Sequence, residues 1–234
     1  MWSLKPFKAP SLDGLHRGFF SQLWLLVGVL VKSLVLEVFN SGIVPSYLNQ
    51  TLITLIPKHP GVDCIFAFRP ISLCNTIYKT ISKVIVVRLR PHLEDIISPL
   101  QAAFVPNRWG VDNVIIIQEL LHTMSQKKEG KVGFMAIKID LEKAYDRLEW
   151  GFIKDTLSLF NVPEYLGKVI MNCISTSLIS VLVNDGALEP FQPPKGIQQD
   201  DPMSPYIFIM CMKVLGFLIK DKCDSNLGDL VYAF

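Results

Sequence analysis

Four carboxylates stand close together in the segment "FMAIKIDLEKAYDRLEW", residues 134–150: Asp140, Glu142, Asp146 and Glu149. An apolar run rich in isoleucine, residues 133–139, precedes Asp140 and predicts a buried strand, because β-branched residues after a glycine turn favour strands. An aspartate at the end of a rigid strand is well placed to hold a divalent metal, since the neighbouring loops leave a cleft beside it. Asp140 is therefore the first candidate for chemistry.

The other three acids have a simpler interpretation. The chain after the aspartate predicts a helix, on which Glu142 and Asp146, and likewise Lys143 and Arg147, stand four residues apart. This spacing is typical of solvated charge pairs on a helix surface. We therefore interpret Glu142 and Glu149 as surface residues.

Two further clusters gather polar side chains. The segment "KGIQQDDPMSPYIF", residues 195–208, places a glycine, two amides and two acids before a predicted helix, and Asp201 just before the first-turn proline indicates ordinary N-capping. The segment "FRPISLCNTIYKTISK" carries Arg69, Lys79 and Lys83, which could face phosphate, although a basic helix face is more often solvated. Neither cluster defines a function by itself.

Composition excludes several classes of protein. The chain has 234 residues, enough for one large domain or two small ones, and half of them are hydrophobic, which argues against disorder. Its 23 Lys and Arg nearly balance its 21 Asp and Glu, so any contact with nucleic acid must come from local patches. The five cysteines form no C-x-x-C pair and no two of the four histidines have metal-ligand spacing, which predicts buried free thiols and solvated or capping histidines.

One segment, residues 23–39, is apolar enough to suggest a membrane helix. Lys32 and Glu37 interrupt it, and a spanning helix needs about 20 predominantly apolar residues. We predict a buried or half-buried helix instead, and no membrane association. The sequence shows no convincing targeting signal, so the expected localisation is intracellular, nuclear or cytoplasmic.

Periodicity predicts helices alternating with short strands, and so an α+β fold. A helix capped by Ser11 or Asp13 should run to Phe39 and end at Asn40-Ser41-Gly42. The remaining predicted elements are a strand at 51–58, a loop at 59–68, a helix at 72–90, a helix from Asp112 or Asn113 to 127, helices at 147–160 and 164–175, strands around "SVLVN" and "LEPF" joined at Asp185-Gly186, and a helix from Pro202 to about Lys220.

The order of the motifs is more specific than any one of them. "NSGIVPSYLNQTLITLIPK", "FRPISLCNTIYKTISK", "LQAAFVPNR", "IKIDLEKAYDRLEW" and "GIQQDDPMSPYIF" follow one another along the chain, after "APSLDGLHRGFF" near its start. In this order they resemble the reverse transcriptase domain of non-LTR (LINE-type) retrotransposons, especially those of plants. The resemblance covers nearly the whole chain.

The resemblance implies a right-hand polymerase fold with fingers and palm. We expect residues 1–50 to be a helical lead-in, 51–131 a fingers-like part and 132–234 a partial palm with an incomplete palm sheet and no thumb. The implied partners are an RNA template, a DNA primer and deoxynucleoside triphosphates, with two Mg²⁺ ions held by palm carboxylates.

The resemblance also implies roles for individual residues. Asp140 matches the first catalytic and metal-binding acid, and Tyr145 matches the aromatic residue beneath the incoming sugar. Gln199 matches the loop glutamine near the nucleotide, and Arg69, with Lys58 as a weaker candidate, matches a fingers residue that contacts the triphosphate. The basic residues Lys79 and Lys83 are candidates for contact with nucleic acid.

The chain departs from the family pattern where the family loop reads Gly-Leu/Ile-Arg-Gln-Gly-Asp-Pro-Leu-Ser-Pro. Gln198 stands for the arginine and Asp200 for the second glycine, and Asn107 replaces a glycine in "VPNR". Glycine is used where a backbone needs a positive φ or approaches a ligand closely. A carboxylate at Asp200 should also repel a triphosphate, by about 4 kcal/mol at 4 Å before screening.

The family's second acidic motif, Tyr/Phe-Ala-Asp-Asp, does not follow the last predicted helix. We therefore expect a truncated piece of a retroelement polymerase that is inactive alone, with poor solubility where palm strands would pack. The alternatives are a non-catalytic nucleic-acid-binding relic of the same fold and a domain related to group II intron maturases. The oligomeric state stays open.

Overall fold

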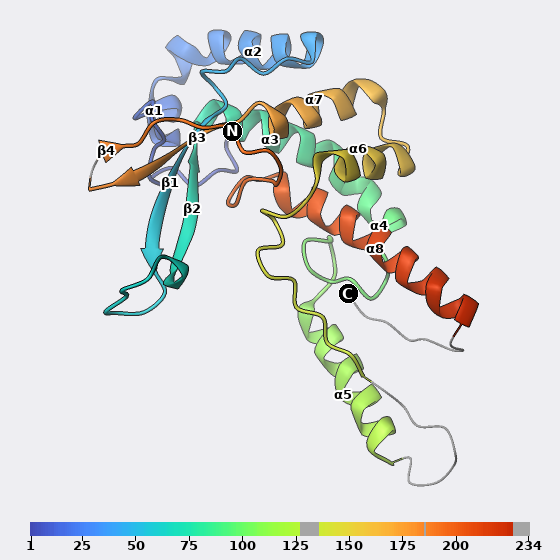
Figure 1. Cartoon of the computed structure of the whole chain (residues 1–234). Helices are drawn as coiled ribbons and strands as arrows, with labels where there is room; N and C mark the ends of the chain where they lie inside the picture. Colours follow the sequence, from blue (N-terminus) through green and yellow to red (C-terminus); the bar gives the residue numbers. More distant parts are fainter. Residues whose placement is uncertain (127–135, 185, 227–234) are drawn as a thin grey trace.

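The computed structural model describes residues 1–126, 136–184 and 186–226 (Figure 1). The helices of these ranges are α1 (Arg17–Gln22), α2 (Trp24–Ser41), α3 (Thr76–Leu89), α4 (Leu93–Ile96), α5 (Gly110–Gln126), α6 (Trp150–Leu159), α7 (Glu164–Ser175) and α8 (Ser204–Asn226). The strands are β1 (Gln50–Pro57), β2 (Phe68–Cys74), β3 (Leu178–Val183) and β4 (Gly186–Ala187), and two short 3₁₀ turns lie at Ile65–Ala67 and Arg90–His92. The α+β prediction is confirmed as a mixed fold with a four-stranded sheet among these residues.

The sheet has the strand order β2-β1-β3-β4 (Figure 1). β1 pairs antiparallel with β2 from Thr51 opposite Cys74 to Pro57 opposite Phe68, which makes a long hairpin whose tip extends away from the helices. β1 pairs parallel with β3, with Gln50 opposite Leu178. A parallel pair needs a crossover connection, and here the chain between the two strands includes β2 and the helices α3 to α7. The alternation of Thr with Leu or Ile in "TLITLI" fits this half-buried strand.

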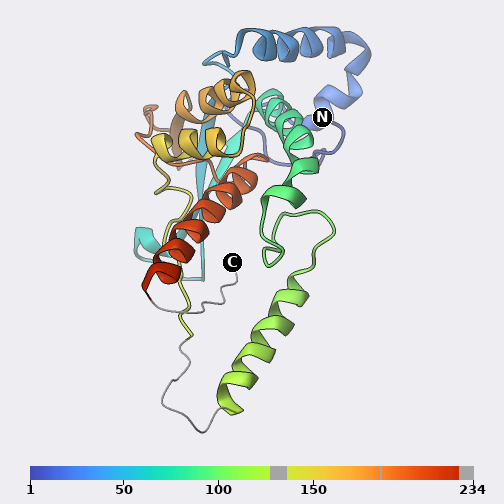
Figure 2. The same ribbon diagram turned by 90° about the vertical axis from the view of Figure 1, so that its right-hand side faces the viewer.

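The hydrophobic core lies where α3, α6, α7 and α8 meet. Each of these helices contributes fully buried side chains, among them Ile81, Ile153, Ile170 and Met210. The views in Figures 1 and 2 show α8 crossing beside α3, with α6 and α7 next to them. These helices place the start of α8 beside the end of β2, and the functional residues discussed below lie at that junction.

Asn49 joins the sheet to this helical core. Its side chain is buried just before β1, and its Nδ2 donates to Cys173 O at 2.8 Å and to Thr176 Oγ1 at 2.9 Å, both at the end of α7. Asn172 adds a parallel link, because its Oδ1 accepts from Val44 N at 2.7 Å. Two polar side chains thus fix the chain before β1 against α7.

Replacing Asn49 should destabilise the fold measurably. In Asn49→Ala the Cys173 carbonyl loses its short amide donor inside the protein, and unsatisfied buried groups cost about 1–3 kcal/mol each. We expect the free energy of unfolding, measured by urea denaturation, to fall by about 2 kcal/mol. Asn40→Ala, at an exposed position of α2, is the matched control, and an equal loss in both variants would contradict this role.

The first helical segment divides in two, and the predicted caps Ser11 and Asp13 are wrong. His16 is the N-cap of α1, with its Nδ1 accepting from Phe19 N at 3.2 Å, and the helix breaks at Leu23 before α2 begins. The predicted stop is confirmed, since Gly42 has φ 73° and donates its N–H to Val38 O. A left-handed residue after the last turn is a common way to end a helix.

The prediction of a half-buried helix is confirmed for α2, because Val38 belongs to the core and Leu34, Val35 and Phe39 pack against it, whereas full burial is wrong. Only Gly28, Val31 and Val38 are buried on it, while Leu25 is 97 % exposed, and Figure 2 shows the helix lying along the top of the molecule. α2 is also the one helix in the described ranges that is long and apolar enough to cross a membrane. Buried core helices and signal sequences have the same length and composition, so this finding does not assign α2 to a membrane.

The predicted end of the loop at 59–68 and the predicted start of the helix at Ser72 are both wrong. Residues Phe68–Cys74 form β2 rather than loop and helix, because this segment pairs along its whole length with β1. α3 begins only at Thr76, after Asn75. Cross-strand pairing decided this boundary, and it overrides a helical spacing of apolar residues.

The strand predicted at residues 133–139 is not seen where it can be assessed. Residues 133–135 lie outside the described ranges, and 136–140 have no regular structure. The helix predicted directly after Asp140 is also wrong, because residues 142–147 form turns in which Lys143 has φ 51°. α5, which precedes this region, has no buried residue and projects away from the body in Figures 1 and 2.

The C-terminal elements agree more closely with the sequence. α7 has the predicted bounds, α6 and α8 differ by a few residues at their ends, and β3 contains most of "SVLVN". "LEPF" forms no strand, although Phe191 makes an isolated bridge with Ile179, and the second strand is the short β4. Asp185 of the predicted turn lies outside the described ranges.

Candidate nucleotide-binding site

Two segments far apart in sequence, the turn at 141–149 and the loop at 195–201, are bonded to each other through their backbones. Gly196 N donates to Leu148 O at 2.8 Å, and Ile197 N donates to Tyr145 O at 3.0 Å. The indole Nε1 of Trp150 donates to Gly196 O at 2.9 Å. These three bonds hold the predicted nucleotide-binding residues of both segments in one place.

Gly196 is required for this close approach. Its φ is 90°, and a Cβ at this position would lie 3.0 Å from Asp146 O and 3.1 Å from Tyr145 O. A side chain there would clash with backbone that cannot move without breaking the bonds between the two segments. The glycine of the "KGIQQDDP" motif is therefore explained by its contact with the other motif.

Tyr145 and Gln199 face the same site. Gln199 Nε2 donates to Asp146 Oδ1 at 3.2 Å, across a separation of 53 residues. The Tyr145 ring stacks on Phe208 of α8, with centroids 5.0 Å apart. Burial raises the pKa of the Tyr145 hydroxyl, so this half-buried ring stays neutral at physiological pH. The sequence placed both residues in one site, and the structure brings them together.

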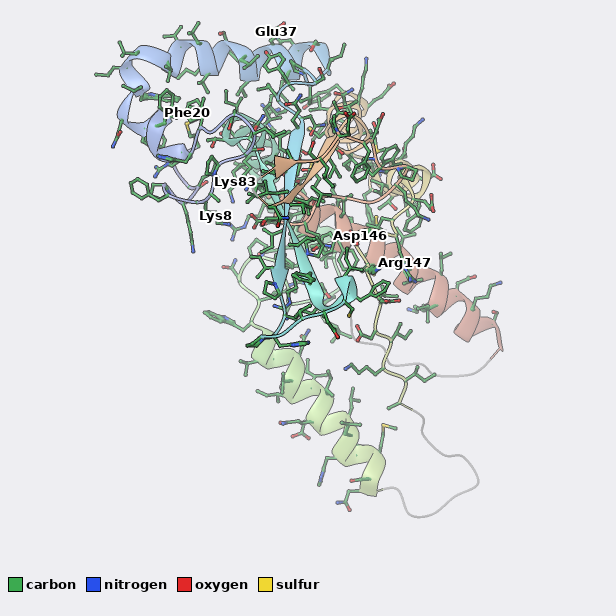
Figure 3. All side chains as sticks on the ribbon, turned by 60° about the vertical axis from the view of Figure 1, so that its left-hand side comes forward. Lys8, Phe20, Glu37, Lys83, Asp146 and Arg147 are labelled. Carbon is green, nitrogen blue, oxygen red and sulfur yellow. The ribbon has the colours of Figure 1, made fainter. Side chains whose placement is uncertain are left out.

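A cavity of about 460 Å³ opens beside these two residues. Its wall includes Tyr145 and Gln199, the start of α8 at Ser204 and Pro205, and Cys74 at the end of β2. Its basic residues are Lys5, Lys8, Arg17, Lys79 and Lys83, and its acids are Asp200 and Asp201. We call this cavity the basic pocket; two of its lysines, Lys8 and Lys83, are labelled in Figure 3.

Three of the basic residues were not predicted from sequence. Lys79 and Lys83 come from α3, but Lys5, Lys8 and Arg17 come from the N-terminal segment and α1, which fold over the same pocket. Their only sequence signal is a local excess of cations around "APSLDG", with Lys5 and Lys8 before it and Arg17 after it. Such clusters are usually solvated, and only the tertiary fold shows which cavity they line.

Asp200 has the backbone conformation of the glycine that it replaces. Its φ is 67°, and Asn107, at the other replaced glycine, has φ 57°. Both positions thus keep the left-handed conformation, which aspartate and asparagine tolerate better than most residues. The Asp200 carboxylate pairs with Lys8 Nζ at 3.3 Å and Lys79 Nζ at 3.4 Å.

Asp201 caps α8, as the sequence indicated. Its Oδ2 accepts from Met203 N at 3.2 Å and from Ser204 Oγ at 3.3 Å, while its buried Oδ1 has no protein partner. Burial raises the pKa of the Asp201 carboxyl from 3.8 to about 6, and the hydrogen bonds oppose that rise only in part. The carboxyl therefore titrates in the mildly acidic range.

The raised pKa of Asp201 makes stability depend on pH in a defined direction. The folded state binds the proton of the Asp201 carboxyl more tightly than the unfolded state does. Protonation of Asp201 therefore contributes to the free energy of unfolding in full below pH 4, and this stabilisation is lost as the pH rises through about 6. Asp201→Asn keeps an acceptor for the cap without the charge. Relative to the parent, its free energy of unfolding should rise between pH 4 and 7, by about 3 kcal/mol at most. Urea denaturation across this range tests it, with exposed Asp155→Asn as control; a pH-independent difference would contradict the assignment.

Asp140 lies apart from the basic pocket. It is exposed in the irregular segment at 136–140 and is not part of the pocket wall. The surface interpretation of the neighbouring acids is confirmed: exposed Glu142 pairs with Arg147 at 3.0 Å and exposed Glu149 pairs with Lys195 at 2.8 Å. The expected four-residue pairs are replaced by the Glu142–Arg147 pair, because this segment is a turn and not a helix.

Arg69 and Lys58 also lie outside the pocket wall. Both are exposed on the β1–β2 hairpin, and Lys58 Nζ donates to Phe66 O at 2.9 Å within the hairpin tip. The tip reaches the turn after Asp140, because Lys143 Nζ lies 5.2 Å from the centroid of the Phe66 ring. The structure thus gathers Tyr145, Gln199, Lys79 and Lys83 and leaves the hairpin residues at a neighbouring place.

The described residues do not complete a metal centre. In residues 1–126, 136–184 and 186–226, no group of three or more His, Cys, Asp or Glu side chains could hold an ion. Asp140 offers the hard oxygen donor that Mg²⁺ prefers, but magnesium sites draw on more ligands than one carboxylate. The predicted two-ion site therefore stays a prediction.

The described cysteines form no disulfide and are mostly buried. Cys74, Cys173 and Cys211 are free and buried as predicted, whereas Cys64 is exposed. Burial raises the pKa of Cys74 to about 12, so the thiol stays protonated, and its Sγ donates to Gln198 Oε1 at 3.0 Å. Gln198, the residue in place of the family arginine, thus braces the loop against β2.

Comparison with known proteins identifies the family of this chain. The family described as "Reverse transcriptase (RNA-dependent DNA polymerase)" matches residues 56–234, and the chain therefore belongs to that family. The chain is 29 % identical to the "Transposon TX1 uncharacterized 149 kDa protein" of Xenopus laevis over 92 % of its own length and 17 % of that protein. It is 25 % identical to the "Retrovirus-related Pol polyprotein from type-1 retrotransposable element R2" of Nasonia vitripennis, over 92 % of the chain and 21 % of the relative.

These relatives confirm the resemblance to non-LTR, LINE-type reverse transcriptase domains. A further relative, the R2DM Pol polyprotein of Drosophila melanogaster, is 25 % identical over 81 % of the chain and 18 % of its own length. The chain spans about a fifth of the length of these relatives. The plant-type affinity and the truncation stay predictions.

Proposed function

We propose that this chain is the fingers-and-palm part of an RNA-directed DNA polymerase and that the basic pocket binds the incoming deoxynucleoside triphosphate. One observation carries the proposal: Tyr145 and Gln199, from segments far apart in sequence, line one cavity together with Lys79 and Lys83. We assign residues 1–50 to the lead-in, 51–131 to the fingers and 132–234 to the palm. The parent protein would use an RNA template and a DNA primer, in the nucleus or cytoplasm.

The pocket offers each part of a nucleotide a suitable contact. The lysine ammonium groups of the pocket attract phosphate, because each offers a full positive charge and several N–H donors. The Tyr145 ring, fixed by stacking on Phe208, gives the sugar a flat apolar surface. Gln199 presents an amide at the same wall and is held by Asp146. Together these groups would bind and orient the nucleotide.

Asp140 is proposed as one carboxylate of the metal site and Arg69, with Lys58, as a phosphate contact from the hairpin. Divalent magnesium, when bound in enzymes of this kind, neutralises triphosphate charge and activates the primer hydroxyl. The contact of Lys143 with Phe66 supports this proposal, because it places the hairpin tip close to the segment that follows Asp140.

Equilibrium binding tests the nucleotide site without requiring catalysis. Binding of dATP in the presence of Mg²⁺, measured by isothermal titration calorimetry, should be weakened about three- to tenfold in Gln199→Ala, the range expected for one lost hydrogen bond. Gln118→Ala, on exposed α5, is the matched control. Undetectable binding by the parent chain, or equal weakening in both variants, would contradict the proposal.

Primer extension on an RNA template separates an active from an inactive domain. Because no acids join Asp140 in a metal-holding cluster among the described residues, we expect no product above the Asp140→Ala background. Asp140-dependent synthesis would disprove inactivity. Nucleotide binding without synthesis would favour a polymerase fragment, whereas nucleic-acid binding without nucleotide binding would favour the relic or the maturase-like domain.

A further inference from the structure

Asp200 is the residue that joins the N-terminal segment to the basic pocket. Its carboxylate lies between Lys8, which belongs to the first ten residues, and Lys79, which belongs to α3. Residues 3, 4, 5, 8 and 9 line the pocket, so this segment forms part of its wall. We call residues 1–10 the N-terminal strap.

We propose that Asp200 substitutes for a ligand phosphate between Lys8 and Lys79, and that this contact latches the N-terminal strap over the basic pocket until a polyphosphate displaces it. The inference rests on the proposed nucleotide site, whose regulation it describes. It follows from the position of Asp200, because the glycine that the family places there has no side chain to pair with either lysine.

The strap is attached at three places. At its beginning, Arg17 Nη2 donates to Trp2 O at 3.2 Å, the Arg17 guanidinium lies over the Trp2 ring, and Trp2 contacts Trp24 edge to face. Near its end, Lys8 is held by Asp200. Between these points Gly18 N donates to Pro6 O at 2.9 Å. The Phe7 ring also contacts the His16 ring edge to face, with centroids 5.6 Å apart. Release of Lys8 would therefore loosen the strap only from Phe7 onward and leave Trp2 and Pro6 anchored.

The two ion pairs differ in their exposure to water. The Lys79 side chain is only 12 % exposed, whereas those of Lys8 and Asp200 are 54 % and 39 % exposed. A largely buried charge needs a counterion, while an exposed pair contributes little to stability. Lys79 therefore needs an anion beside it, either Asp200 or a phosphate that replaces it, and the exposed pair with Lys8 is the weaker of the two.

The charge of the pocket favours exchange of Asp200 for a stronger anion. Five basic residues line the pocket against two acids, and the start of α8 adds the positive end of its dipole. A triphosphate carries more negative charge than one carboxylate and has more acceptor oxygens for the same lysines. It would pair with Lys8 and Lys79 once Asp200 turns away, at the cost of repulsion from the displaced carboxylate.

Asp200→Asn isolates the charge from the backbone conformation. Asparagine has the same shape and tolerates the positive φ of 67° at this position, so the loop should keep its conformation. Asp200→Gly removes both the charge and any strain. Glu119→Gln, on exposed α5, removes one negative charge from a place remote from the pocket wall and serves as the control for net charge. Circular dichroism would check that each variant folds.

The latch itself is tested without nucleotide, by chymotrypsin cleavage after Phe7, whose side chain is 78 % exposed. We expect cleavage to be about three- to tenfold faster in Asp200→Asn and Lys8→Met than in the parent, and unchanged in Lys8→Arg and Glu119→Gln. Such a change is within the range of weak, partly exposed ion pairs. Equal cleavage rates in the parent and in Asp200→Asn would overturn the latch.

Displacement is tested with inorganic tripolyphosphate as the probe. Its affinity, measured by calorimetry, should increase about five- to tenfold in Asp200→Asn and Asp200→Gly and stay unchanged in Glu119→Gln, and its addition should accelerate cleavage of the parent after Phe7. Unchanged affinity in Asp200→Asn, with dATP binding still weakened by Gln199→Ala, would overturn the phosphate substitution and leave the nucleotide site standing. Faster cleavage of Asp200→Asn with no dATP binding by any variant would support the latch and reject the nucleotide site.

Discussion

The close backbone approach between the 195–201 loop and the 141–149 turn is the constraint on which the site depends. It is possible only because Gly196 has no side chain, and it brings Tyr145 and Gln199 to one wall of the basic pocket. The same loop leads into α8 through the Asp201 cap, so the site is joined to the helical core. Packing of α8 against α6 and α3 therefore supports the position of the loop, and the loop in turn holds the turn that follows Asp140.

Charge in the pocket is arranged around Asp200 and Asp201, which are neighbours with different roles. Asp201 is buried, caps a helix and has a raised pKa because its surroundings exclude water. Asp200 is partly exposed, adopts a positive φ and pairs with two lysines from separate elements. One residue thus stabilises the start of α8, and its neighbour links the N-terminal segment to α3. The sequence indicated the cap and the glycine-like position, whereas the lysine partners of Asp200 and the burial of Asp201 come from the tertiary structure.

The agreement between sequence and structure is best where local chemistry dominates. β1, α7, the Gly42 stop and the Asp201 cap were predicted because alternation, helical spacing, glycine and capping act within a few residues. Predictions failed where distant contacts decide the outcome: β2 forms because β1 pairs with it, although the local spacing predicts a loop and a helix there. The segment after Asp140 forms turns held by the 195–201 loop, a contact that no local pattern encodes.

The sequence by itself determined the family, four residues of the basic pocket (Tyr145, Gln199, Lys79 and Lys83) and the two positions, Asn107 and Asp200, where a glycine-like conformation is needed. These follow from residue types and their order, which the chain carries directly. Only the tertiary structure decided that Lys8 and Arg17 belong to the same pocket as Gln199, and that Asp200 faces lysines. The physical reason is that electrostatic and packing contacts act through space, so their partners are fixed only when the folded chain brings distant segments together.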